Sequence, residues 1–81
     1  MMGTMEKLQQ LVVKVSKGRL SEAALTPEAR LNEDLGLDSL AQSELIVLVE
    51  DTFGITVGLE DAAKVATIAG ILTFIEGQTA S

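Results

Sequence analysis

The sequence predicts an all-α fold, a small bundle of three main helices plus one short helix, with a long first loop. Two observations predict it. Apolar residues recur at the spacing of a helix face in three separate segments, and the one short stretch of strand character, "TVGLE" at residues 56–60, has no second strand to pair with. With 81 residues and neither a linker nor an internal repeat, the chain is expected to form a single domain, 1–81, with an ordered core over about 4–77.

A first helix is predicted from about Met5 to Lys17. Its apolar stripe follows the spacing i, i+3, i+4, i+7 and consists of Leu8, Leu11, Val12 and Val15. We expect Thr4 to cap the start of this helix and Gly18 to close its end.

Residues 19–38 form a long irregular connection, in which Pro27 starts a predicted helical turn at Pro27–Leu31. A loop of this length in a compact domain is unusual unless it is functional or held by its own side chains. We expect leucines to insert into the helical core and hold it in place: Leu20, Leu25, Leu31, Leu35 and Leu37.

The second main helix is predicted to begin at Ser39 and to end at Gly54. The letters "SLAQ" fit the S-x-x-Q capping box, in which the Ser39 oxygen accepts the backbone N–H of Gln42 and the Gln42 side chain reaches back. Gly54 suits a left-handed closing residue, with Ile55 folding back on the last turn. The inner stripe is expected to consist of Leu45, Ile46, Val49 and Phe53.

After a short extended stretch, Glu60–Lys64 is predicted to form a single helical turn. Thr67 then caps the last main helix, whose inner face consists of Ile68, Ile71, Leu72 and Ile75. Gly77 and the tail that follows it are expected to end the ordered part of the chain.

The composition restricts the chemistry that this chain performs by itself. It contains neither cysteine nor histidine. Disulfides, thiolate metal sites and the usual dyads and triads that pair a nucleophile with histidine are therefore excluded. The acidic side chains are spread along an outer face and do not converge in a pocket, so we predict no catalytic residue, no metal site and no enzyme activity.

The charge is distributed unevenly along the chain. The net charge is −6, and residues 31–81 carry nine acidic side chains against Lys64 as the single base. Such a surface repels nucleic acid and anionic lipid and steers toward basic protein surfaces, although a solvated acidic face with no partner is the alternative. No segment reaches the roughly 18–20 apolar residues of a membrane span, and the N-terminus lacks a signal-peptide pattern. We expect a soluble cytoplasmic monomer, because one core uses up the apolar stripes.

The stretch "EDLGLDSL", residues 33–40, resembles the modification motif of acyl carrier proteins, in which leucine and glycine precede a variable residue and Asp-Ser-Leu. The flanks are similar too. "SELIVLVEDTFGI" resembles the second helix of that family, and "LEDAAKVATIAGILTFIEG" resembles its third and fourth helices. The resemblance is ungapped from about Leu31 to Ile75 and looser over the first helix. It implies that a phosphopantetheinyl transferase attaches 4′-phosphopantetheine from coenzyme A to Ser39.

The resemblance also implies roles for the neighbours of Ser39. Asp38 helps the transferase and its metal ion to recognise the site, and Leu40 is a docking contact. Acidic residues of the second helix meet basic docking patches on partner enzymes, with one exposed apolar contact among them; the implied docking residues are Glu44, Val47, Glu50 and Asp51. Each residue also has a plain structural interpretation: a capping serine, a helix-start acid, a core leucine or a solvated face.

The implied function is that of a discrete phosphoprotein carrier, which holds acyl groups as thioesters between acyl-loading, condensing or transferring enzymes. The pathway stays open between fatty-acid, polyketide and specialised acyl biosynthesis. Ala41 stands where fatty-acid carriers often have Asp, and uncharged Gln42 and Ser43 follow it, which favours a specialised partner set. The chain lacks the "GG(H/D)S" form of peptidyl carriers, yet an aminoacyl or peptidyl carrier, or an unmodified interaction module, remains an alternative.

Overall fold

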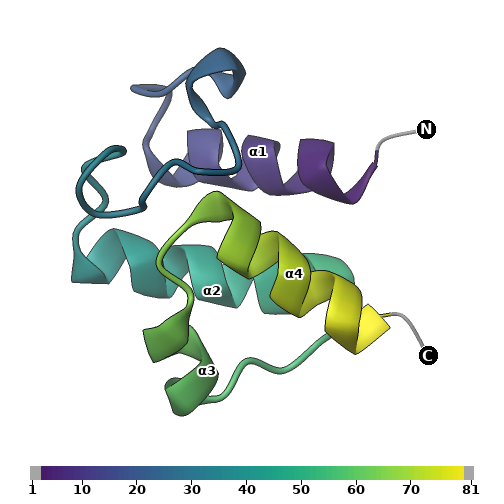
Figure 1. The fold of residues 1–81 in the computed structure, drawn as a ribbon. Helices are drawn as coiled ribbons and strands as arrows, with labels where there is room; N and C mark the ends of the chain where they lie inside the picture. Colours follow the sequence, from purple (N-terminus) through teal and green to yellow (C-terminus); the bar gives the residue numbers. More distant parts are fainter. Residues whose placement is uncertain (1–2, 80–81) are drawn as a thin grey trace.

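The computed structural model describes residues 3–79 and contains four α-helices and a short 3₁₀-helix over that range. These are α1 (Thr4–Val15), η1 (Glu22–Ala24), α2 (Ser39–Phe53), α3 (Leu59–Lys64) and α4 (Ile68–Thr79). Figure 1 shows α1 and α2 lying antiparallel, with α4 packed beside them and the short α3 below α2. The predicted all-α bundle of three main helices and one short helix is confirmed. No helix within the described range is long and apolar enough to cross a membrane.

The core lies where α1, α2 and α4 meet, and it is aliphatic. Each helix contributes the apolar face that its periodicity predicts, because a face of this kind is stable only when it is removed from water. The most deeply buried helical residues are Leu8, Val12, Leu45, Val49, Ile68, Ile71 and Ile75, each at most 2% exposed. Of the other predicted members of the inner stripes, Val15 is 7% exposed and the rest are half-buried: Leu11, Ile46, Phe53 and Leu72.

The long first loop is held by its leucines, as predicted. Leu25, Leu31, Leu35 and Leu37 are each at most 4% exposed, and Leu20 packs against the core while half-buried. The loop backbone is also joined to the start of α4. The N–H groups of Ile68 and Ala69 donate to the carbonyls of Ala29 (3.1 Å) and Pro27 (2.9 Å), and the Leu31 N–H donates to Ala66 (2.9 Å). The loop therefore satisfies N–H groups that the first turn of a helix leaves without intrahelical partners.

This pairing explains why the predicted helical turn at Pro27–Leu31 is wrong. The carbonyls of Pro27 and Ala29 accept N–H groups from the start of α4 and not from within a helical turn. Arg30 forms an isolated antiparallel bridge with Thr67. A helical turn occurs earlier in the loop, as η1. Thr67 caps α4 as predicted, since its Oγ1 accepts the Gly70 N–H at 3.0 Å.

Three predicted helix ends need correction. Thr4 is the first residue of α1, and Gly3 occupies the cap position with no side-chain hydrogen bond. The same helix ends at Val15 because Lys17 adopts a left-handed conformation (φ 58°) and the Ser16 hydroxyl donates to the Val13 carbonyl. At the other end of the chain, α4 continues through Gly77 to Thr79, so Gly77 does not end the last helix; Ala80 and Ser81 lie outside the described residues.

Candidate functional site

Two buried leucines fix the loop that leads into α2. Leu35 and Leu37 are inserted in the core, and Gly36 between them has a φ of 67°, a conformation that glycine adopts without a steric penalty. The Leu37 N–H donates to the Leu31 carbonyl at 2.9 Å. The backbone is thus anchored one residue before Asp38 and two residues before Ser39.

Asp38, and not Ser39, caps α2. Its backbone is extended (φ −75°, ψ 179°), and its Oδ1 accepts the N–H of Ala41 at 2.8 Å. The predicted capping box is therefore wrong in register by one residue. The side chain of Gln42 does reach back, but it donates to the Leu37 carbonyl at 2.8 Å. Aspartate and serine are equally good caps in general, and here the buried Leu37 places the extended backbone of a cap at Asp38.

Ser39 is consequently the first residue of α2, and its side chain is exposed. Within the described part of the chain, its hydroxyl makes no hydrogen bond, and the N–H groups of Ser39 and Leu40 are not paired with protein acceptors. Ser43, one turn later, offers a contrast. It is also exposed, but its hydroxyl donates to the Ser39 carbonyl at 2.9 Å.

A groove of about 230 Å³ opens beside Ser39, between α2 and α3. One wall comes from α2 and contains Ser39, Gln42 and Ile46, while Ala62 and Val65 contribute to the opposite wall. The groove therefore places a mixed polar and apolar surface within reach of any group attached to the Ser39 oxygen.

The four implied docking residues of α2 have different environments. Val47 is 54% exposed, and Glu44 and Asp51 are exposed as well. Glu50 is half-buried, and its Oε2 accepts the N–H of Val57 at 2.9 Å. This bond connects α2 to the segment before α3, so Glu50 has a structural task that the sequence pattern did not reveal.

Leu40 is 70% exposed, although it follows directly after the start of α2. This exposure excludes the interpretation of Leu40 as a core residue. Among the side chains that the structure describes, Leu40 and Val47 are the two large apolar ones that are exposed. Leu40 and Val47 are seven residues apart on α2, so they lie on the same side of the helix.

An ionic cluster precedes the site in the loop. The Arg30 guanidinium contacts Glu33 at 2.7 Å, and the Arg30 N–H donates to Asp34 Oδ2 at 2.8 Å. That backbone hydrogen bond, followed by the charge of Arg30, lowers the pKa of the Asp34 carboxyl from its ordinary value of 3.8. No group of three or more acidic side chains within residues 3–79 is arranged to hold a metal ion.

One comparison with known proteins bears on this geometry. A family model described as "Phosphopantetheine attachment site" matches residues 6–75. The chain belongs to this family. Phosphopantetheine attachment domains carry 4′-phosphopantetheine in covalent linkage, so the predicted family and cofactor are confirmed.

The match extends over most of this chain, from the first turn of α1 to Ile75 in α4. It includes the anchored loop, all of α2 and the groove between α2 and α3. Two features of the domain were missed from sequence, the Asp38 cap and the hydrogen bond of Glu50. The first had a signal, because Asp38 directly precedes Ser39. The second had none, because Glu50 and Val57 meet only in the folded chain.

Proposed function

We propose that this chain is an acyl carrier protein and that Ser39 bears its 4′-phosphopantetheine. The observation that carries the proposal is the exposed Ser39 hydroxyl, which makes no hydrogen bond in the described structure while Asp38 caps the helix. Modification of this oxygen breaks no internal contact, and the cap of α2 stays in place.

The start of α2 also suits the charge of a phosphodiester. The unpaired N–H groups of Ser39 and Leu40 lie at the positive end of the helix dipole. An anion on the Ser39 oxygen is favoured there by about 0.3–1 kcal/mol. The residues present therefore fit the group that this family carries.

The attachment step needs only one reacting atom from this chain. The Ser39 oxygen forms a new bond to the phosphorus next to the pantetheine, the pyrophosphate bond of coenzyme A breaks, and adenosine 3′,5′-bisphosphate leaves. The chain has no histidine or cysteine to accept the hydroxyl proton. The Asp38 carboxylate is held in place as the cap by the Ala41 N–H, and we propose that the transferase supplies the base.

When bound, the group supplies a terminal thiol that holds an acyl group as a thioester. Ser39 fixes the other end of the group at the mouth of the groove between α2 and α3. The side chains of Ile46, Ala62 and Val65 give that groove an apolar part of its lining, and Gln42 and Ser43 give it a polar part. The groove thereby lies where it can shelter part of the attached group from water.

Partner enzymes are proposed to dock on the exposed face of α2. Glu44 and Asp51 meet basic side chains, and Leu40 and Val47 supply apolar contacts. Glu50 contributes less, since its carboxylate is held by Val57. Exposed ion pairs are individually weak, at most about 1 kcal/mol each, which suits a carrier that must leave every partner.

The pathway is proposed to be fatty-acid, polyketide or specialised acyl biosynthesis. An uncharged first turn, with Ala41 and Gln42, distinguishes α2 from the acidic helix of housekeeping carriers and favours a specialised set of enzymes. An aminoacyl or peptidyl cargo is the alternative. We further propose that the carrier works as a cytoplasmic monomer, without nucleic-acid or membrane partners, and has no catalytic activity of its own.

Loading of the holo-protein tests this function. After modification, the thiol is offered to an acyl–carrier synthetase with a fatty acid, and in parallel to an adenylation enzyme with an amino acid. The account predicts a hydroxylamine-labile acyl adduct with the first enzyme. If only the adenylation enzyme loads the thiol, the chain is an aminoacyl carrier. If Ser39→Ala keeps the biological function of the chain, the unmodified interaction module replaces both.

A further inference from the structure

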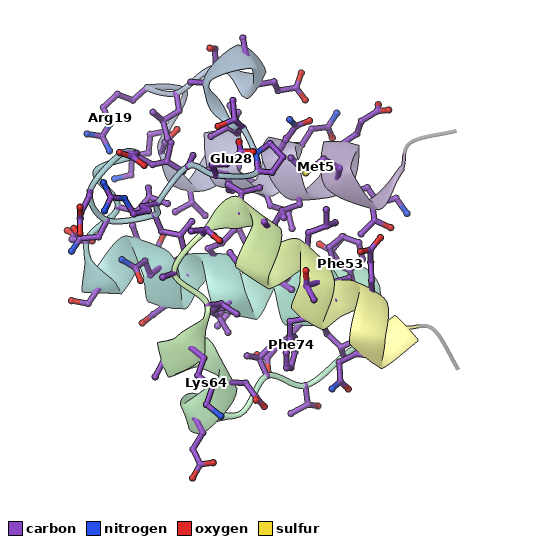
Figure 2. All side chains as sticks on the ribbon, in the orientation of Figure 1. Met5, Arg19, Glu28, Phe53, Lys64 and Phe74 are labelled. Carbon is purple, nitrogen blue, oxygen red and sulfur yellow. The ribbon has the colours of Figure 1, made fainter. Side chains whose placement is uncertain are left out.

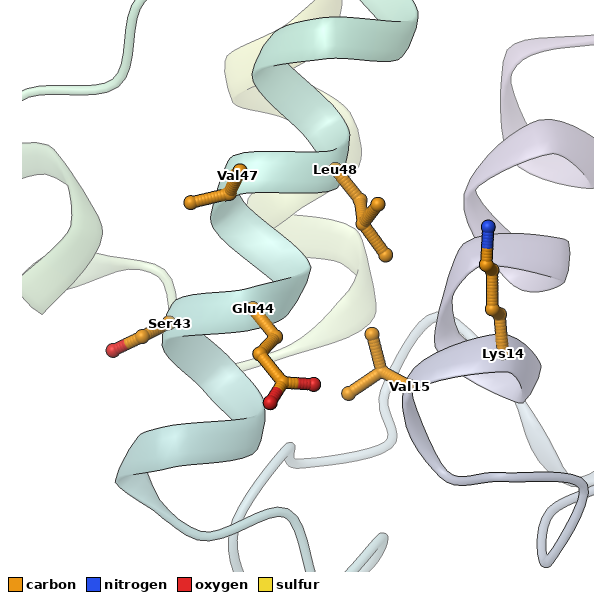
Figure 3. Close-up of a pocket in the computed structure, with 6 residues that line it drawn as sticks. All are labelled: Lys14, Val15, Ser43, Glu44, Val47 and Leu48. Atoms are coloured by element: carbon orange, nitrogen blue, oxygen red, sulfur yellow. The ribbon is translucent and has the colours of Figure 1, made fainter.

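A groove follows the seam between α1 and α2, next to the groove described above, and Ser43 lines both of them. One section, of about 470 Å³, is lined by Val15 and Lys14 of α1 and by Glu44, Val47 and Leu48 of α2 (Figure 3). A second section, of about 460 Å³, adjoins it at Val15 and Glu44 and continues to Asp38 and Leu40, on either side of Ser39. We refer to both sections together as the α1–α2 groove.

The α1–α2 groove has an apolar floor and an apolar rim. Val15 is 7% exposed and Leu48 is half-buried, and Figure 3 shows Leu48 directed from α2 toward α1. The rim contains Leu40 and Val47, which are the two exposed large apolar side chains noted above. Both therefore border one continuous depression, and a partner that fills it removes them from water.

The two walls carry opposite charges. The wall formed by α1 and the turn after it contains Lys14, Lys17 and Arg19, which are three of the six basic side chains in the chain. The wall formed by α2 contains Asp38 and Glu44. None of these five side chains forms an ion pair within residues 3–79.

The basic wall is held in position by the turn after α1. Lys17 is fixed in the left-handed region, and the Ser16 hydroxyl accepts the Leu20 N–H at 3.2 Å. Arg19 projects from this turn at the edge of the molecule (Figure 2), and its guanidinium lies so close to Gly36 that an added Cβ there would be 3.8 Å from it. The Arg19 guanidinium therefore lies near the loop that leads to Ser39.

We propose that the α1–α2 groove binds a protein segment with an apolar stripe, acidic side chains along one flank and basic side chains along the other. The apolar stripe fits the floor, the acidic flank meets Lys14, Lys17 and Arg19, and the basic flank meets Glu44 and Asp38. A uniformly basic segment places like charges against the α1 wall, which is unfavourable. The assignment of the bound segment to an enzyme of the carrier cycle rests on the proposed function. The preference for a segment with one acidic and one basic flank does not depend on it.

The charge pattern favours such a segment over a second copy of this chain. Two copies could place Lys14 of one against Glu44 of the other, but each carries a net charge of −6, so their long-range interaction is repulsive.

Two helix-stabilised peptides of about 15 residues test the proposal. Both have the same leucine stripe; one has glutamates on one flank and lysines on the other, and the second has lysines on both flanks. Reversing a helix exchanges its flanks, so one two-charge peptide samples both directions. Each is titrated into the isotope-labelled, unmodified protein at ~0.15 M salt, and amide shifts are followed by NMR.

The proposal predicts that the two-charge peptide shifts the amides of Lys14, Val15, Val47 and Leu48. It also predicts that this peptide binds at least about fivefold more tightly than the all-lysine peptide. The net charge of the protein, −6, would by itself favour the all-lysine peptide through long-range attraction. Tighter binding of the two-charge peptide would therefore show that the local charges of the groove decide the preference. Lys14→Glu should reverse the preference. Lys64→Glu is the matched control, because Lys64 is exposed on α3 outside the groove, and it should keep the preference (Figure 2).

Equal or tighter binding of the all-lysine peptide overturns the proposal, and so does the absence of groove shifts with either peptide. Groove shifts that depend on protein concentration alone would instead identify a second copy as the occupant. Modification of Ser39 is measured on the same samples. Normal modification without the peptide preference removes only this inference, whereas the preference without modification removes only the proposed carrier function.

Discussion

The Asp38 carboxylate accepts the backbone N–H of Ala41 at 2.8 Å. The sequence-based prediction gave Ser39 two roles, the cap of α2 and the attachment residue. This hydrogen bond assigns the capping role to Asp38. Asp38 closes the start of α2, and the neighbouring Ser39 hydroxyl has no capping role to perform. The proposed modification of Ser39 would therefore leave the helix capped.

Removal of the Asp38 cap should destabilise the fold. Asp38→Ala is expected to lower the free energy of unfolding by about 1 kcal/mol, whereas Asp38→Asn keeps an acceptor and costs less. The measurement is urea unfolding followed by circular dichroism. Asp51→Ala is the matched control, because Asp51 is an exposed acid on the same helix with no side-chain hydrogen bond in the described structure. Equal effects of the Asp38 and Asp51 variants would show that Asp38 is not the cap.

Leu40 should matter for docking and not for stability. Because Leu40 is 70% exposed, Leu40→Ala is expected to change the free energy of unfolding by less than about 0.5 kcal/mol. The fully buried Leu45 on the same helix sets the scale, since Leu45→Ala should cost about 2–5 kcal/mol. The rate at which a transferase modifies Leu40→Ala should fall although the variant is folded. An unchanged rate would remove Leu40 from the docking surface.

The Arg30–Asp34 contact should appear in the pH dependence of stability. The pKa of Asp34 is lowered in the folded chain, first by the Arg30 N–H and then by the charge of Arg30. A lowered pKa in the folded state means that the ionised carboxylate favours folding above its ordinary pKa of 3.8, and that this contribution is lost as the pH falls through the folded value. Stability curves of the wild type and Asp34→Asn should differ most at neutral pH and converge in acid. Parallel curves at all pH values would show that the carboxylate contributes nothing.

The helices were predictable because their signals are local. The stripe through Leu45 and Val49 has the period of a helix face. Gly54 ends α2 with a φ of 66°, and the Ile55 N–H donates to the Glu50 carbonyl at 3.2 Å. This is the predicted closure of α2. The burial of the loop leucines also followed from composition, since a long loop in a small domain must contribute to the core.

What could not be predicted depends on contacts between distant residues or on one backbone angle. The sequence around Pro27 favours a helical turn locally. The carbonyls of this loop instead accept the N–H groups of Ile68 and Ala69, which are remote in sequence and could not be foreseen. The one-residue error in the cap arose because Asp38 and Ser39 are adjacent and both are good capping residues. The choice between them was decided by backbone conformation, since Asp38 is extended and its side chain accepts the Ala41 N–H in the folded chain.

Intact mass is the most direct test of the central claim that Ser39 carries the arm. The wild type, Ser39→Ala and Ser43→Ala are each incubated with coenzyme A, Mg²⁺ and a broad-specificity phosphopantetheinyl transferase. The Ser43 variant is the matched control, because that exposed hydroxyl lies one turn away and donates to the Ser39 carbonyl. The account predicts a gain of one phosphopantetheine group in the wild type and in Ser43→Ala, and none in Ser39→Ala. No gain in a folded wild type, with the transferase active on another carrier, or a gain in Ser39→Ala, would contradict it.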